Sequence, residues 1–336
     1  MGRVFGGRWA VDPGAGPVTP ALISFEVGQE RLNWLDLVAA LKAGHQAPKA
    51  KIEDLFLYRG SDTLLSRSAW IDGMGLLTKT ATVFPGNRTA GQPMIGGGVM
   101  LFDDATGALA AVIDFHLITK WKTAGDSLVA ALALAPAGAR EILIVGAGTV
   151  GRSLVEAFGA GFPEARFSIW NRSPKAAEVF AQETGAQVAS DLQSAVAAAD
   201  IILTCTMTTA PIIQGDWLRP GQHLNMIGAY RPDMREADDA ALQKSKLFVD
   251  SYDTTLGHIG ELKIPLDSGA IDRSHLQADF YDMDAFRAGP GDITVFKNGG
   301  GAHLDLMTAR YVLDQWPARA GAAALDKTGN ARAGRV

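Results

Sequence analysis

A glycine-rich turn between an apolar strand and a helix constrains the fold of this chain more than any other feature. The segment ILIVGAGTVGRSL places Gly146, Gly148 and Gly151 in the pattern G-x-G-x-x-G, directly after an apolar run. The first glycine permits the tight turn, the second lets the backbone approach a pyrophosphate, and the third allows the helix to pack closely on the strand. The first helical turn offers N–H groups to an anion. We therefore predict a dinucleotide site formed by Gly146, Ala147, Gly148, Thr149, Val150 and Gly151.

The surrounding sequence alternates apolar strands with helix-length segments from about residue 141 onward. This pattern is typical of βαβ units and a parallel sheet. Earlier in the chain, residues 76–118 have the composition of antiparallel strands, and residues 122–135 that of a helix linking two domains. A further helical stretch begins near residue 300. The sequence thus predicts an α/β protein with a Rossmann-type doubly wound parallel sheet and a second, smaller unit.

Composition excludes several classes of function. The 336 residues suggest two domains, and a net charge of -5 offers no basic field for nucleic acid. Cys205 is the only cysteine, and the six histidines form no ligand motif, so we expect neither a disulfide nor a metal site. The sequence has no signal-peptide core and no apolar run near the roughly 20 residues that a membrane span needs. We expect a soluble, cytoplasmic protein.

The end of the second Rossmann strand bears on cofactor choice. An NAD site usually carries an acid there for the ribose 2'-hydroxyl, but RFSIW is followed by Asn171, Arg172, Ser173 and, soon after, Lys175. Two cations without an acid favour NADP(H) over NAD(H), with Arg172 available to a 2'-phosphate or to adenine. A solvated turn is the alternative. Thr206, in the turn after the strand IILT, is assigned to the same cofactor site.

Two lysines stand in positions where a cation is unexpected. Strand alternation places Lys79 on the same face as Leu77 and Ala81, so the ammonium points inward unless it lies at an edge and reaches water. With Thr119 as N-cap, Lys122 falls in the first turn of its helix, where a cation opposes the helix dipole. A substrate carboxylate between Lys79 and Lys122 would explain both positions.

These motifs together resemble the ornithine cyclodeaminase and mu-crystallin family over roughly residues 50–312. The landmarks are KTATVFPGN, ITKWKTAGDSLVAALALA, IVGAGTVG, the NRS turn, GAYRPDMREADD and ITVFKNGGGAHLDL. The resemblance implies a homodimer in which a Rossmann domain is inserted into an α+β substrate-binding and dimerisation domain. The expected boundaries are 122–299 for the NADP(H)-binding domain, and 1–121 with 300–336 for the other.

Site residues follow from the resemblance position by position. The family's substrate-binding lysine falls on Lys79, and its arginine in the motif RTA is replaced by Lys122 in KTA. Another family arginine could match Arg59 or Arg67, and both remain open. Asp305, in HLDL, falls on a family aspartate and could balance a substrate cation.

The loop GAYRPDMRE distinguishes branches of the family. Cyclodeaminases carry an aspartate where this chain has Tyr230, whereas RPDMREADD is similar to mu-crystallin and to reductases of cyclic ketimines. The resemblance therefore implies NADPH-dependent reduction of a small cyclic imino acid, such as Δ1-pyrroline-2-carboxylate or Δ1-piperideine-2-carboxylate, to L-proline or L-pipecolate. Tyr230 could line the pocket, relay a proton or have no role.

Three alternatives to reduction remain: ornithine cyclodeamination, an opine-type amino-acid dehydrogenase, and a non-catalytic NADP-dependent binding protein of mu-crystallin type. The ring size of the substrate and the proton donor are open. The segment GHIGELK could border the nicotinamide, and Glu261 within it is expected at the surface rather than in the site. Asp126 and Ser127 are expected to make local helix and domain contacts.

Overall fold

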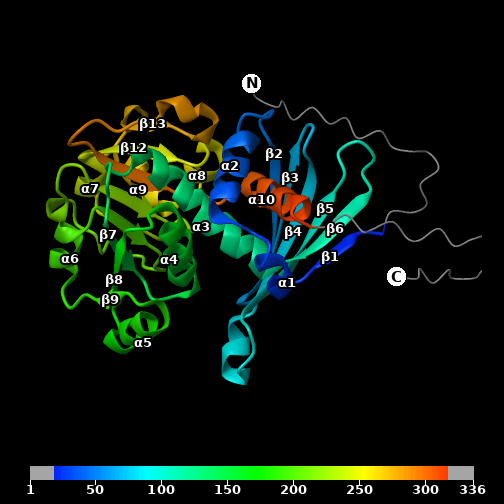
Figure 1. Cartoon of the computed structure of the whole chain (residues 1–336), viewed down its shortest axis with the longest axis horizontal. Coiled ribbons are helices and arrows are strands. Elements are labelled where there is room, and N and C mark those ends of the chain that lie inside the picture. The colour runs from blue at the N-terminus through cyan, green and yellow to red at the C-terminus, as the bar shows by residue number, and fades with distance from the viewer. Residues whose placement is uncertain (1–18, 317–336) are drawn as a thin grey trace, which may run out of the picture.

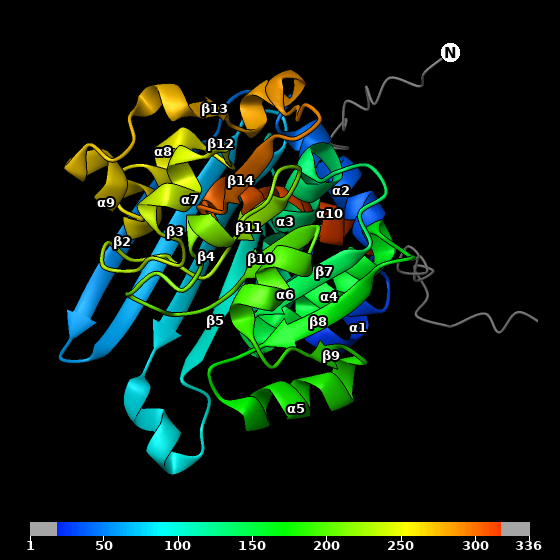
Figure 2. The ribbon, with the colours of Figure 1, turned by 90° about the vertical axis from the view of Figure 1, so that its left-hand side faces the viewer.

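The computed structural model describes residues 19–316, which form two sheets on either side of a long shared helix (Figures 1 and 2). The first sheet, called sheet A, has six strands, and the second, sheet B, has eight. The shared helix, α3 (Phe115–Leu134), begins directly after the last strand of sheet A and ends before the first strand of sheet B. No helix within the described part of the chain is both long and apolar enough to cross a membrane.

Sheet A is built almost wholly from antiparallel neighbours, as predicted for residues 76–118, although residues 115–118 belong to α3. Only its short first strand pairs in parallel. In spatial order the strands are β1 (Ala21–Ile23), β6 (Leu109–Asp114), β5 (Ile95–Phe102), β4 (Gly75–Val83), β3 (Asp62–Ile71) and β2 (Lys51–Arg59). Helices α3 and α10 (Ala302–Asp314) pack against it, α1 (Phe25–Gln29) packs on α3, and α2 (Trp34–Gly44) packs on α3 and α10.

One face of sheet A is covered and the other is open. Along β4, buried and half-buried residues alternate, as expected when one side of a strand faces a core. Leu77, Lys79 and Ala81 lie on the covered face, beneath α3 and α10. The inward position predicted for Lys79 is therefore correct, and the alternative of an edge lysine in water is wrong.

Helix α3 begins earlier than the sequence suggested. Its N-cap is Asp114, whose carboxylate accepts hydrogen bonds from the backbone N–H groups of His116 and Leu117 at 2.7 and 3.0 Å. Thr119 is not the N-cap, because its hydroxyl donates to the carbonyl of Phe115 within the helix at 2.8 Å. Lys122 consequently lies in the middle of the helix and is buried. The predicted conflict between Lys122 and the helix dipole does not exist.

Sheet B is parallel throughout, and its first five strands in chain order are arranged as in a Rossmann fold. Across the sheet its strands are β13 (Leu276–Ala278), β12 (Ser245–Val249), β14 (Ile293–Lys297), β11 (His223–Met226), β10 (Ile201–Thr204), β7 (Glu141–Val145), β8 (Arg166–Trp170) and β9 (Gln187–Val188). The chain order reverses between β7 and β10, and such a switch point is where parallel sheets bind ligands. The fold class predicted from the sequence is confirmed.

Helices cover both faces of sheet B because its strands are apolar on both sides. Ile142 and Ile144 join the core that includes α3, whereas Leu143 and Val145 face a second core on the opposite side. The helices are α4 (Thr149–Gly161), α5 (Pro174–Thr184), α6 (Leu192–Ala198), α7 (Asp239–Gln243), α8 (Tyr252–Thr255) and α9 (Gly260–Ser268). Short 3-10 turns occupy Pro85–Ala90, Gly215–Trp217, Arg273–His275 and Phe280–Ala285.

The two sheets share one continuous core through α3. Asp126 and Ser127 lie on this helix and are fully buried. The side-chain amide of Asn298 donates to the Asp126 carboxylate at 2.6 Å, and the Ser127 hydroxyl donates to the carbonyl of Thr123 at 3.0 Å. The expected contacts are therefore present, within the helix for Ser127 and to a distant loop for Asp126.

Candidate active site

The glycine loop leaves space where a dinucleotide would approach. Gly146 has φ of +117°, and a Cβ there would lie 2.9 Å from the carbonyl oxygen of Cys205. A Cβ on Gly151 would lie 2.6 Å from the carbonyl oxygen of Gly146, so any larger residue would push α4 away from β7. A Cβ on Gly148, the N-cap of α4, would meet nothing within 4 Å. The backbone at Gly148 is therefore accessible, and the first turn of α4 fits a pyrophosphate.

The turn after β8 presents two free cations. The Asn171 side chain accepts from the backbone N–H of Ala147 at 3.2 Å and donates to the carbonyl of Ser173 at 3.2 Å, which ties this turn to the glycine loop. Arg172 and Lys175 are exposed, and neither makes a salt bridge or side-chain hydrogen bond within residues 19–316. The predicted cofactor residues of the glycine loop and this turn therefore lie together.

A buried glutamate fixes the turns after β10 and β11. Glu236 accepts from both the backbone N–H and the hydroxyl of Thr206 at 2.7 Å, and its second oxygen accepts from the N–H of Gly228 at 2.7 Å. The two turns approach so closely that a Cβ on Gly228 would lie 1.9 Å from the carbonyl oxygen of Thr206. Sequence reasoning did not identify Glu236, because nothing local indicates that this residue is buried.

The expectation that Glu261 lies at the surface is wrong. Glu261 is fully buried and accepts from the backbone N–H groups of Glu236 and Ala237 at 2.7 and 3.0 Å. Burial and the charge of Glu236 raise the pKa of Glu261 to about 7. In the turn before α9, partial burial and the charge of Arg67 lower the pKa of His258.

Lys79 forms a buried ion pair with Asp305. The Lys79 ammonium donates to Oδ1 of Asp305 at 2.9 Å and to the hydroxyl of Thr119 at 2.9 Å, and it lies 4.7 Å from the centroid of the Phe115 ring. Asp305 is fully buried near the start of α10, and its Oδ2 has no hydrogen-bond partner within the described residues. A buried acceptor without a partner suits a site that receives a ligand or water.

Lys122 and Arg67 converge on the same place from two other elements. The Lys122 ammonium lies 3.9 Å from Oδ1 of Asp305 and donates to the carbonyl of Gly300 at 3.0 Å. Arg67, the cross-strand neighbour of Lys79 in sheet A, donates through Nη1 to the same carbonyl at 2.7 Å. Its other nitrogens bind Asp54 at 2.7 and 3.3 Å. We call Arg67, Lys79 and Lys122 the cation cluster.

The charged groups of this site shift one another's pKa values. Burial raises the pKa of Asp305, but the positive charges of Lys122, Lys79 and Arg67 outweigh this effect and lower the pKa below its ordinary value. Burial lowers the pKa of Lys79 to about 8, despite the attraction of Asp305. The negative charges of Asp305, Asp54 and Asp250 all act on Arg67. A substrate carboxylate would therefore meet cations whose charge is already largely matched, and its binding would depend on their N–H donors.

The cation cluster reaches the carboxyl edge of sheet B. Gly300 lies in the loop after β14, and this strand runs parallel to β11 and β10, whose following turns hold Gly228 and Thr206. The glycine loop follows β7 at the same edge. The two groups of predicted residues, one for a cofactor and one for a carboxylate, therefore meet at the edge where such folds bind ligands.

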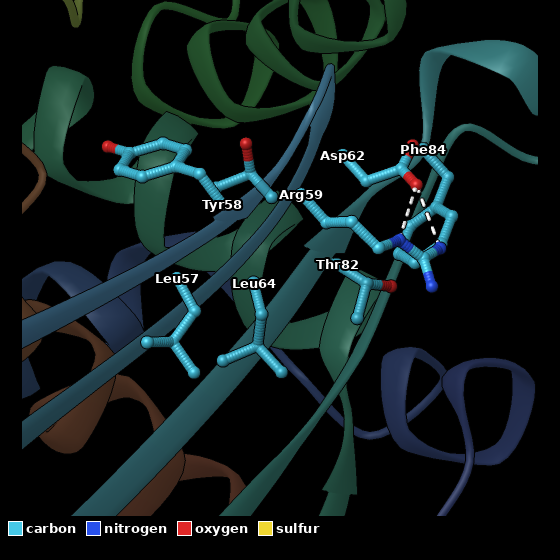
Figure 3. Close-up of a pocket in the computed structure, with 8 residues that line it drawn as sticks. Leu57, Tyr58, Arg59, Asp62, Leu64, Thr82 and Phe84 are labelled. Carbon is cyan, nitrogen blue, oxygen red and sulfur yellow. Dashed lines mark hydrogen bonds and ion pairs between the residues drawn. The ribbon is translucent and has the colours of Figure 1, made fainter.

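Tyr230 and Arg59 make no side-chain hydrogen bond or ion pair with the cation cluster within residues 19–316. Tyr230 is 55% exposed, and its ring lies 5.9 Å from the guanidinium carbon of Arg231. Arg59 pairs with Asp62 at 2.9 Å at the end of the β2–β3 hairpin, where both line a shallow pocket with Phe84 (Figure 3). Of the two arginines left open by the sequence, only Arg67 contacts the site. No group of three or more His, Cys, Asp or Glu residues within 19–316 is arranged to hold a metal ion.

Comparison with known proteins agrees with this arrangement. Residues 71–320 match the model of the ornithine cyclodeaminase/mu-crystallin family. The chain belongs to this family. Its relatives include the Delta(1)-pyrroline-2-carboxylate reductase of Paracoccus denitrificans, which is 47% identical over 87% of this chain and 96% of that protein. The ketimine reductase mu-crystallin of Mus musculus is 38% identical over 72% of this chain and 76% of its own length.

A solved structure of this family shares the whole architecture. The Delta(1)-pyrroline-2-carboxylate reductase of Thermococcus litoralis, determined in complex with NADH and L-proline, superposes with a TM-score of 0.80. It is 25% identical, and the match covers 88% of this chain and 97% of that one. An archaeal alanine dehydrogenase dimer with bound NAD has the same fold, with a TM-score of 0.80 at 23% identity over 88% of this chain and 95% of that one.

Proposed function

We propose that this family member reduces a cyclic ketimine carboxylate, with Δ1-pyrroline-2-carboxylate as the leading substrate and Δ1-piperideine-2-carboxylate as the six-membered alternative. The observation that carries the proposal is the cation cluster, which reaches the same carboxyl edge of sheet B as the glycine loop. A relative with 47% identity bears the name of such a reductase. The position that an acid occupies in cyclodeaminases holds Tyr230.

The proposed roles follow from charge and position. A bound nicotinamide supplies the hydride, which adds to C2 of the protonated C=N bond and leaves a secondary amine. Lys79, Lys122 and Arg67 hold the substrate carboxylate, and this orientation supplies much of the rate. Asp305, an anion at the same place, balances the iminium charge, because its Oδ2 has no other partner in the described structure. The product thus gains two hydrogens: the hydride on C2 and the iminium proton on nitrogen.

We further propose that NADP(H) is preferred to NAD(H). The turn after β8 has no acid to bind a ribose 2'-hydroxyl, and Asn171 is occupied by contacts with Ala147 and Ser173. Arg172 and Lys175 are exposed beside it and are suited to a 2'-phosphate. The solved reductase of Thermococcus litoralis contains NADH, so relatives can differ at this position.

A homodimer would cover the open face of sheet A. The strand register places Leu55, Leu57, Trp70 and Met100 on this face, and their side chains are 40–56% exposed. Figure 3 shows Leu57 and Leu64 pointing to the same side of the sheet. An apolar sheet face of this kind is typical of an interface with another protein. We propose a second copy of this chain as the partner, and the two parts of the chain outside 122–299 as the domain that dimerises.

Oxidation of NADPH in the presence of each imine, with ornithine as the control substrate, tests the proposed activity. Ammonia release from ornithine without net use of NADPH would favour cyclodeamination instead. Cofactor binding without turnover of any imine would favour a binding protein.

A further inference from the structure

Asp250 connects the Rossmann domain to the cation cluster through one glycine. It follows β12, and its side chain is fully buried. Oδ2 accepts from the backbone N–H of Gly300 at 2.6 Å, and Oδ1 accepts from the N–H of Ser251 at 2.7 Å and from the hydroxyl of Thr255 at 2.8 Å. Three donors hold this carboxylate in a single orientation, so its position is well defined.

The carbonyl of the same glycine orients two members of the cation cluster. It accepts from Nη1 of Arg67 at 2.7 Å and from Nζ of Lys122 at 3.0 Å. The N–H of Gly300 is therefore fixed by the Rossmann domain, while its C=O fixes cations from sheet A and α3. A rotation of this residue would move both cations relative to any substrate carboxylate.

The glycines of this turn leave little freedom for an alternative arrangement. A Cβ on Gly299 would lie 2.4 Å from Oγ1 of Thr255 and 2.7 Å from Oδ1 of Asp250. Gly300 has φ of +70°, and a Cβ there would lie 3.0 Å from Nζ of Lys122. Gly299 is thus explained by close approach to Asp250 and Thr255, and Gly300 by its left-handed conformation and its approach to Lys122. A Cβ on Gly301 would instead lie 2.6 Å from Cγ2 of Thr254.

We infer that Asp250 is a positioning residue for recognition of the substrate carboxylate, acting through Gly300 on Arg67 and Lys122. Without the Asp250 carboxylate, the Gly300 carbonyl is free to rotate away from Lys122. The ammonium, already 3.9 Å from Asp305, then pairs more closely with that carboxylate and is withdrawn from the substrate. This inference rests on the proposed function for the identity of the substrate.

The test compares Asp250→Asn and Asp250→Ala with the control Asp279→Asn. Asp279 is also a buried aspartate and accepts from two backbone N–H groups, those of Tyr252 and Tyr281, but it does not contact Gly300. KM and kcat for the imine, the Kd of NADPH and the Tm are measured for each variant. Loss of the Asp250 carboxylate raises KM for the imine about tenfold or more in Asp250→Ala and less in Asp250→Asn, whose amide oxygen can still accept.

A role in positioning requires that kcat and the Kd of NADPH change by less than about twofold while KM rises. Asp279→Asn keeps the wild-type KM. A wild-type KM in Asp250→Asn and Asp250→Ala contradicts the inference, as does an equal rise of KM in Asp279→Asn. If Asp250→Ala does not fold, the KM of Asp250→Asn decides. A wild-type protein that reduces neither imine contradicts the proposed function instead, so the two failures are distinguishable.

Discussion

Lys79 and Asp305 are 226 residues apart in the sequence, and their side chains meet in a buried ion pair of 2.9 Å. Lys79 lies on β4 of sheet A, and Asp305 lies near the start of α10. All strands of sheet B come between them in the sequence. A buried pair of this kind contributes little net stability once the desolvation of both charges is counted. Its position beside Lys122 and Arg67 is better explained by a role in binding an anionic substrate.

The pKa of Lys79 predicts an alkaline limit to activity. Because burial lowers this pKa to about 8, the free enzyme loses the ammonium charge as the pH rises through that value. The attraction for the substrate carboxylate is then lost, so kcat/KM falls above about pH 8. In Lys79→Arg the cation persists to higher pH, and the alkaline limb shifts upward. The substrate imine titrates equally in both proteins, so identical alkaline limbs would refute the assignment to Lys79.

Replacement of Tyr230 by phenylalanine is expected to have little effect. The phenol is 55% exposed, and its ring lies 5.9 Å from the guanidinium carbon of Arg231. A neutral phenol is a poor general base. We predict that Tyr230→Phe retains kcat/KM for the imine within about twofold. A fall of a hundredfold in steady-state kcat/KM would instead assign Tyr230 to proton transfer.

Arg172 is expected to determine cofactor preference. Arg172→Ala removes a guanidinium available to the 2'-phosphate, so KM for NADPH should rise by about tenfold or more while KM for NADH is nearly unchanged. Arg166→Ala is the matched control, because Arg166 lies at the opposite end of β8 and pairs with Glu141. Initial rates with both cofactors decide the matter. Equal effects on NADPH and NADH would show that Arg172 does not recognise the phosphate.

We expect that a lysine cannot replace Arg67 in substrate binding. It holds Gly300 and Asp54 at once, and a lysine cannot present donors in this fork. We expect Arg67→Lys to raise KM for the imine by about tenfold, because the remaining cations are displaced. Arg59→Lys, at the hairpin end, keeps the wild-type KM. Steady-state kinetics on the two variants would contradict the assignment if Arg59→Lys had the larger effect.

The sequence predicted those parts of the site that depend on local periodicity. Strand alternation placed Lys79 inward, and the spacing of Gly146, Gly148 and Gly151 located the glycine loop. Helix start signals were less reliable, because Asp114 and Thr119 are both acceptable N-caps and only the path of the chain out of β6 selects Asp114. Lys122 does lie near Lys79, because both ammonium groups approach Asp305. The reason given from the sequence, a cation in the first turn of the helix, is not supported by the structure.

Residues that act through tertiary contacts were not accessible to sequence reasoning. Asp250, Glu236 and Glu261 are fully buried carboxylates whose partners are backbone N–H groups, mostly from other segments of the chain. Nothing in their local sequence distinguishes them from surface acids. The β3–β4 register, which pairs Arg67 with Lys79, would have been enough to choose Arg67 over Arg59 as the site residue. That register depends on the hairpin turn between the strands.

The most direct test of the account is the initial rate of NADPH oxidation at 340 nm by the purified wild-type chain with Δ1-pyrroline-2-carboxylate. Δ1-piperideine-2-carboxylate is assayed in parallel, and ornithine serves as the control. We expect at least one imine to be reduced, with NADPH giving the higher kcat/KM of the two cofactors, and no NADPH oxidation with ornithine. A protein that binds NADPH yet reduces neither imine would contradict the proposed function.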